Sequence, residues 1–150
     1  MQRAHIQSFF DPATFTVTHV VSDPATRKAA VVDSVLDYDP KAGRSSHESA
    51  DRVVAYVRES GLAVEWLLET HAHADHLSAA QYLRQQLGGR LGIGAHIREV
   101  QATFRKVFNA LDMNEEGAEF DCLFEDGERF RIGELEVEVI HTPGHTPACL

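Results

Sequence analysis

The chain of 150 residues is long enough for one domain, and its 43% hydrophobic and 25% charged residues are typical of a soluble globular protein. Its 14 basic and 23 acidic residues give a net charge of −9, which disfavours nucleic acids and anionic membranes as partners, because both need a basic surface. The first seven residues contain no apolar signal-peptide core, and Cys122 and Cys149 do not form a CxxC pair. We therefore expect a reduced, cytoplasmic protein.

The first part of the chain predicts a hairpin followed by a helix. Residues 14–21 alternate as a half-buried strand does, and residues 29–36 form an apolar run that is typical of a buried strand. Ser45 and Glu48 have the spacing of a capping box. Ala50 and three valines follow at helical spacing, and Gly61 suits a C-terminal stop, so the pattern predicts a helix between the capping box and this glycine.

Strands and helices continue to alternate along the rest of the chain. Residues 64–70 and 91–95 predict short strands, with a helix over about 77–87 between them. Apolar residues at helical spacing from Ile97 to Leu111 predict a longer amphipathic helix whose apolar stripe faces the core. From Glu134 onwards apolar residues alternate with glutamates, as in a half-exposed antiparallel strand. This mixture predicts a layered α/β fold.

Three of the nine histidines fall within six residues, in the segment His71-Ala72-His73-Ala74-Asp75-His76. Because His71 and His73 are two residues apart in an extended segment, their rings project to the same side and can bind one metal ion. Asp75 and His76 would then begin the next helix, where Asp75 could cap the free N–H groups. The alternative is a solvated strand-to-helix turn, but such a turn needs no three histidines.

A second histidine motif lies near the end of the chain, at Thr142-Pro143-Gly144-His145-Thr146. Proline and glycine predict a tight turn that can aim His145 toward the first cluster. Taken alone this signal is weak, and it gains weight from the first motif. His141 is expected to be structural or supporting. The other four histidines have no motif around them and are expected to be structural, namely His5, His19, His47 and His96.

Together, Thr70-His71-Ala72-His73-Ala74-Asp75-His76 and Pro143-Gly144-His145-Thr146 resemble the metallo-β-lactamase superfamily, whose first motif is HxHxDH. Within it the chain is most similar to the persulfide dioxygenase and glyoxalase II branch, which also fits the early hairpin ending in Val31-Val32-Asp33. The resemblance covers most of the chain. It implies an αββα sandwich with its metal site at one edge of the two sheets.

The resemblance implies two alternative metal sites. In the hydrolases His71, His73 and His145 would hold one zinc, and Asp75 and His76 a second metal. In the persulfide dioxygenases His71 and His145 would hold a single Fe(II) with an aspartate, and the other three residues would line or support the site. Such a site leaves open positions for O₂ and a thiol-derived substrate. Asp75 is also the candidate catalytic residue.

The aspartate ligand, a last histidine and the residues that grip glutathione follow the second motif in this family. Here they would lie after Leu150. The resemblance therefore implies one metallo-β-lactamase-like domain over residues 1–150 without its C-terminal portion, a sandwich cut after its first half. Residues 148–150 would begin a further strand. Exposed inner sheet faces promote association, so a homo-oligomer or a complementing second chain is one outcome.

Three functions remain open from the sequence. The first is an Fe(II)-dependent persulfide dioxygenase that uses O₂ to oxidise glutathione persulfide to sulfite, releasing glutathione. The second is a zinc-dependent, glyoxalase II-like hydrolase of a glutathione thioester, in which metal-bound hydroxide attacks the carbonyl. The third is an inactive or incomplete metal-binding fragment. A nucleic-acid-processing member of the superfamily fits the net charge of −9 less well.

Overall fold

A computed structural model describes residues 3–112 and 114–150. Met1 and Gln2, which belong to the segment expected to contain no signal peptide, lie outside the described residues. The elements in chain order are β1 (His5–Asp11), β2 (Thr16–Ser22), β3 (Lys28–Val32), β4 (Val35–Asp39), β5 (Arg44–Ser46), α1 (Glu48–Glu59), β6 (Ala63–Leu68), β7 (Leu77–Ser78), α2 (Ala80–Leu87), β8 (Arg90–Gly94), α3 (Ile97–Val107), β9 (Cys122–Phe124), β10 (Arg129–Ile132) and β11 (Leu135–Glu138). No described helix is long and apolar enough to cross a membrane.

The main sheet has six strands in the order β1-β2-β3-β6-β8-β9. The first three are antiparallel neighbours, so the predicted hairpin is confirmed as β2 and β3. From β3 to β9 the neighbours run parallel. The carboxyl ends of these parallel strands therefore meet at one edge of the sheet, which is where open α/β sheets commonly place ligands.

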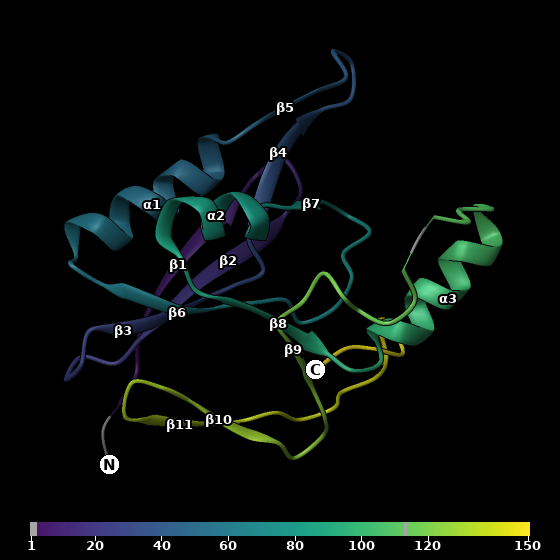
Figure 1. Cartoon of the computed structure of the whole chain (residues 1–150). Coiled ribbons are helices and arrows are strands. Elements are labelled where there is room, and N and C mark those ends of the chain that lie inside the picture. The colour runs from purple at the N-terminus through teal and green to yellow at the C-terminus, as the bar shows by residue number, and fades with distance from the viewer. Residues whose placement is uncertain (1–2, 113) are drawn as a thin grey trace.

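Two layers cover the two faces of this sheet, as Figure 1 shows. Helices α1 and α2 pack on one face, and Val53, Val57 and Leu83 are almost fully buried there. The β10–β11 hairpin covers part of the other face, where Trp66 and Phe124 belong to a second apolar cluster. The layered α/β architecture is thus confirmed.

The predicted strand over residues 29–36 is wrong in one respect, because it breaks at Asp33. This residue has a φ of +53°, and its backbone N–H donates to Leu68 O (2.9 Å). Its carboxylate accepts hydrogen bonds from Thr70, which follows β6. Aspartate tolerates the left-handed region better than most residues. Beyond the break, β4 joins a separate three-stranded sheet in the order β5-β4-β7.

The start of α1 does not use the predicted capping box. His47 is the N-cap and makes no side-chain capping bond. The Asp37 carboxylate takes over this role from the neighbouring strand, accepting the Ser49 backbone N–H at 2.8 Å and the Ser49 hydroxyl at 2.6 Å. A tertiary contact has therefore replaced the local cap that the sequence spacing indicated.

The second helix begins later than predicted. Leu77 and Ser78 pair with β4 as the short strand β7, and the helix starts at Ala80 with Ala79 as its N-cap. The expected cap by Asp75 is therefore wrong. Because β4 holds residues 77–78 in extended form, the histidine segment lies wholly in the loop before the helix.

The apolar stripe predicted over residues 97–111 does not face the core, contrary to the prediction, and α3 itself ends at Val107. Ile97 is buried, but Phe104, Val107, Phe108 and Leu111 are between 42% and 73% exposed. Figure 1 shows α3 to one side of the sheet, away from α1 and α2. The helical period was sound, but period alone does not say which element covers the apolar face.

Gly133 joins β10 to β11 and packs closely on the turn after β2. It has a φ of +59°, and a Cβ there would lie 2.0 Å from Thr26 Oγ1 and 2.6 Å from Asp23 Oδ2. We expect Gly133→Ala to lower the free energy of unfolding by about 2–3 kcal/mol, because backbone strain and steric overlap add. Urea denaturation measures the loss. Gly127→Ala is the matched control, because a Cβ at that φ of +73° meets nothing within 4 Å.

Asp23 links the same two turns and gives folding a dependence on pH. The Thr26 hydroxyl (2.7 Å) and the Glu134 N–H (2.8 Å) donate to Asp23 Oδ2 and hold the pKa of Asp23 below its ordinary value. A lowered folded-state pKa stabilises the fold fully above the unfolded pKa of about 4, and this stabilisation is lost as the pH falls through the folded-state value. We therefore expect Asp23→Asn to be less stable than wild type at pH 7, with the gap narrowing at pH 3. Urea midpoints at the two pH values measure it, and an equal gap at both would contradict the assignment.

Candidate metal centre

The histidine segment leaves β6 at the edge where the parallel strands end. The ring centroids of His73 lie 4.2 Å from His71 and 4.1 Å from His76. The ring of His145 packs edge-on against His71, with centroids 4.9 Å apart. The structure thus brings together the four histidines that the two sequence motifs singled out.

The C-terminal segment that carries His145 is a closed loop anchored beside the first motif. Thr142 N–H donates to Cys149 O (2.9 Å), and Leu150 N–H donates to Thr70 O (3.1 Å). The predicted strand at residues 148–150 is wrong, because these residues form no strand and instead fasten the loop to Thr70. This anchor places His145 next to His71.

A hydrogen-bond chain through Thr70 fixes the tautomer of His71. The Thr70 hydroxyl donates to Asp33 Oδ2 at 2.8 Å, so it can only accept from His71 Nδ1, which lies 2.9 Å away. The proton of His71 then sits on Nδ1, and the lone pair of Nε2 is free. Burial also lowers the pKa of His71, which favours the neutral, ligating form.

His73 is held from the opposite ring nitrogen. Its Nε2 lies 3.0 Å from Asp33 Oδ1 and 3.1 Å from Glu69 Oε2, so this nitrogen donates to carboxylates and Nδ1 remains for a ligand. Burial opposes a charge on the ring, but the two carboxylates outweigh it and raise the pKa of His73 to about 10. A metal ion at Nδ1 would therefore have to displace a proton.

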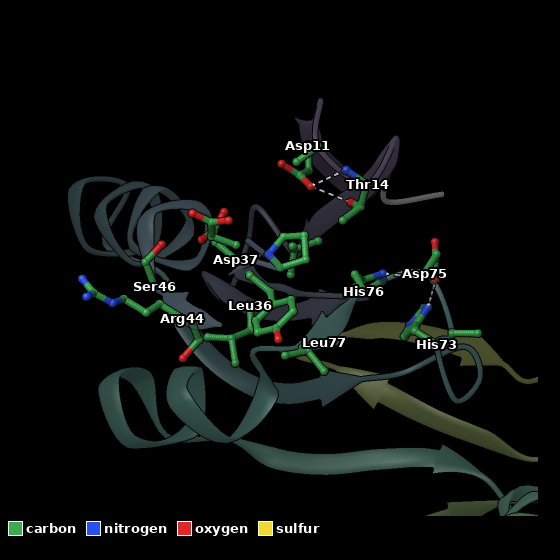
Figure 2. Close-up of a pocket in the computed structure, with 17 residues that line it drawn as sticks. Asp11, Thr14, Leu36, Asp37, Arg44, Ser46, His73, Asp75, His76 and Leu77 are labelled. Carbon is green, nitrogen blue, oxygen red and sulfur yellow. Dashed lines mark hydrogen bonds and ion pairs between the residues drawn. The ribbon is translucent and has the colours of Figure 1, made fainter. Parts of the chain in front are cut away.

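His76 and Asp75 complete the cluster. Burial lowers the pKa of His76, and neither of its buried ring nitrogens makes a hydrogen bond within the described structure. Asp75 Oδ1 lies 3.4 Å from His76 Nδ1 and 3.9 Å from His73 Nδ1, and Figure 2 shows the three side chains turned toward one another. Buried imidazole nitrogens are normally hydrogen-bonded, so this arrangement fits a metal ion as the partner of His76.

The donor set suits a transition metal. The ligand atoms of His73, Asp75 and His76 lie within 4.8 Å of one another, and imidazole with carboxylate is the chemistry that zinc and iron prefer. Asp33, Glu69 and His73 also meet this distance criterion. Their carboxylate oxygens, however, already accept hydrogen bonds from Thr70, Ser78 and His73, so this second group supports the first.

Sequence reasoning missed Asp33 and Glu69. Motif spacing gave no reason to place Asp33 near the histidines, although it follows β3 and Glu69 follows the neighbouring strand β6. Because the carboxyl ends of adjacent parallel strands meet, two acidic residues directly after such strands are a usable signal. Recognising it required knowing that β3 and β6 are neighbours.

A cleft of about 750 Å³ runs from the histidine loop to the β4–β5 hairpin. Figure 2 shows His73, Asp75 and His76 at one end, Arg44 and Ser46 at the other, and Leu36 and Leu77 between them. The lining thus joins a histidine-rich end to an apolar middle and a polar end. This volume is in the range of clefts that bind small molecules.

Four of the five remaining histidines make side-chain contacts away from the cluster. His141 stacks on His96, with centroids 4.5 Å apart, and His141 Nε2 donates to Pro147 O at 2.9 Å. His47 stacks on Tyr82 (3.9 Å), and His19 Nδ1 lies 2.9 Å from the Ser8 hydroxyl. The structural roles expected for these histidines from the sequence stay a prediction.

Comparison with known families identifies the fold. The sequence profile of the metallo-beta-lactamase superfamily matches residues 13–150, and the chain belongs to that superfamily. The fold class implied by the resemblance, that of the metallo-β-lactamase αββα sandwich, is therefore confirmed.

Individual relatives come from more than one branch. The chain is 49% identical over 146 residues to a probable metallo-hydrolase of Burkholderia pseudomallei, covering 97% of this chain and 50% of that protein. It is 30% identical over 145 residues to the mitochondrial persulfide dioxygenase ETHE1 of Homo sapiens, covering 97% and 46%. The crystal structure of ETHE1 from Myxococcus xanthus superposes with a TM-score of 0.70 at 26% identity, covering 97% and 51%. The chain therefore spans about half the length of the curated relatives it matches.

Proposed function

We propose that the polypeptide containing this chain is a persulfide dioxygenase that oxidises glutathione persulfide at a single Fe(II). The observation that carries the proposal is the convergence of His71 and His145 from two separate segments, with centroids 4.9 Å apart. The similarity to ETHE1 in sequence and in structure supports the choice of branch. We further propose that residues 1–150 supply one part of a single domain.

The overall reaction takes one persulfide, one O₂ and one water to glutathione and sulfite, with release of two protons. Bound iron supplies the electron transfer to O₂ and a position for the terminal sulfur. The protein orients this chemistry. Asp33 and Glu69 fix His73, Thr70 fixes His71, and the cleft beside Asp75 receives the substrate.

Asp75 is the candidate catalytic residue of this proposal. Its side chain is 46% exposed, and its Oδ1 lies between His73 and His76 at the end of the cleft. Burial alone would raise its pKa, but its own backbone N–H and the two nearby histidines outweigh this and lower it. A carboxylate that stays ionised here can accept the proton of an arriving persulfide at Oδ1.

A zinc-dependent thioester hydrolase is the second candidate. The 49% identical relative named a probable metallo-hydrolase favours it, and the donor set permits it. His71, His73 and His145 would hold one zinc, and Asp75 and His76 a second. Zinc held by these residues would supply Lewis-acid chemistry for hydrolysis of a thioester.

Metal content and oxygen consumption separate these candidates. We expect the natural polypeptide, purified anaerobically, to contain one iron per chain and to consume O₂ when glutathione persulfide is added. Zinc with hydrolysis of S-lactoylglutathione and no O₂ uptake would replace the proposal by the hydrolase. Absence of both reactions and of tight metal binding would identify an inert fragment.

A further inference from the structure

We propose that Glu69 is a positioning residue of the metal centre. Its carboxylate holds the histidine loop in place and puts a negative charge beside His73. Nothing in the two sequence motifs assigns it a role. The inference rests on the metal site of the proposed function, whichever metal is bound. It follows from three features of the structure: the position of Glu69, its two partners and the cavities beside the loop.

Glu69 occupies a protected position at the root of the loop. It follows the last residue of β6, its backbone N–H donates to Gly92 O at 3.0 Å, and its side chain is only 5% exposed. A buried carboxylate is costly unless its oxygens are paired.

The two oxygens of Glu69 hold the middle and the end of the loop. Oε2 accepts from His73 Nε2 at 3.1 Å, and Oε1 accepts the hydroxyl of Ser78, which in turn accepts the Ala80 N–H at 3.0 Å. One side chain at the start of the loop therefore fastens both its central histidine and the residue that leads into α2. The two ends of the loop, residues 70–77, are thus linked through the hydrogen bonds of Glu69.

Two cavities beside the loop explain why its position depends on the hydrogen bonds of Glu69. The cleft of about 750 Å³ borders His73 and His76, and a second cavity of about 360 Å³ borders His71, His73 and Ser78. Because the loop borders open space in both cavities, packing alone does not hold it in one place. Hydrogen bonds to a fixed carboxylate do, and they leave His73 Nδ1 facing Asp75.

Glu69 also differs from a neutral spacer. An imidazole whose second nitrogen donates to a carboxylate is a stronger metal donor, and loss of such a partner lowers metal affinity by roughly 10–100-fold. Here Asp33 and Glu69 act on the same nitrogen. The geometry therefore predicts that the charge of Glu69, and not only its shape, contributes to metal binding.

The test compares variants that separate three properties: the charge of residue 69, the length of its side chain and the hydrogen bond to Ser78. Glu69→Gln keeps the shape without the charge, Glu69→Asp keeps the charge with a shorter reach, and Ser78→Ala frees Oε1 alone. Zn²⁺ affinity of the natural polypeptide is measured by chelator competition, and mobility of residues 70–78 by hydrogen exchange without metal. Glu59→Gln, an exposed change at the end of α1, is the control for loss of one negative charge.

We expect Glu69→Gln to weaken Zn²⁺ binding about 10–100-fold, Glu69→Asp to weaken it less, and Glu59→Gln to leave it unchanged. Ser78→Ala should speed hydrogen exchange in the loop. Zn²⁺ affinity of Glu69→Gln within twofold of wild type would overturn the inference while leaving the metal site intact. If wild type itself bound neither Zn²⁺ nor Fe(II), the proposed function would fail, and unchanged loop exchange in Ser78→Ala would separately refute the role of Glu69 in holding the loop.

Discussion

Replacing His71 by alanine is expected to lower metal affinity by more than about 100-fold, because removal of a ligand exceeds the loss caused by removing a supporting residue. The Nε2 lone pair of His71 is free to bind a metal ion, because Nδ1 is hydrogen-bonded to the Thr70 hydroxyl. It is also the ring that contacts His145. The fold should persist, because the hydrogen bonds of Asp33 to Thr70 and His73 do not involve the His71 ring.

The measurement is metal stoichiometry and Zn²⁺ affinity of the natural polypeptide, together with its urea midpoint. His5→Ala is the matched control, because His5 is an exposed residue of β1 remote from the loop in sequence and sheet order. It should bind metal as wild type does. Full stoichiometric binding by His71→Ala would remove this residue from the metal site and, with it, the observation on which the proposed function stands.

Replacing Asp33 by alanine is expected to damage both stability and metal binding. The Thr70 N–H and the Thr70 hydroxyl lose their acceptor, and His73 Nε2–H keeps only Glu69 Oε2 of its two carboxylate partners. The φ of +53° adds strain for alanine. Loss of one partner from such a part-buried charge network costs roughly 3–5 kcal/mol, so we expect a fall of this size in the free energy of unfolding.

Asp33→Asn separates the two effects. Asparagine tolerates the left-handed backbone, and its Oδ1 can still accept the Thr70 N–H, so the loss of stability should be clearly smaller than for alanine. Its neutral amide cannot supply charge to His73, so metal affinity should still fall about 10–100-fold. Denaturation curves and chelator competition measure the two quantities. Equal stability of wild type and Asp33→Ala would show that the hydrogen bonds of Asp33 to Thr70 and His73 do not stabilise the fold.

The metal ligands could be predicted as candidates from the sequence because their motifs are local. His71, His73, Asp75 and His76 lie within six residues, and Pro143-Gly144 marks the turn before His145. Whether these residues bind metal stays a prediction. Their supports could not be predicted, since Asp33 and Glu69 become neighbours only when β3 and β6 pair in parallel across the intervening helix. Backbone pairing between distant segments leaves no local pattern.

Local periodicity therefore predicted several strands and helices of this chain, among them β2, α1, β6 and β8, and it predicted the outward glutamates and half-buried apolar residues of β11 correctly. Contacts between elements decided the rest. Asp37 replaced the capping box of α1, pairing with β4 turned residues 77–78 into a strand, and α3 was left with its apolar stripe exposed. The physical reason is that propensity and period act over a few residues, whereas which face is covered, and which polar group is satisfied, depends on partners far away in the sequence.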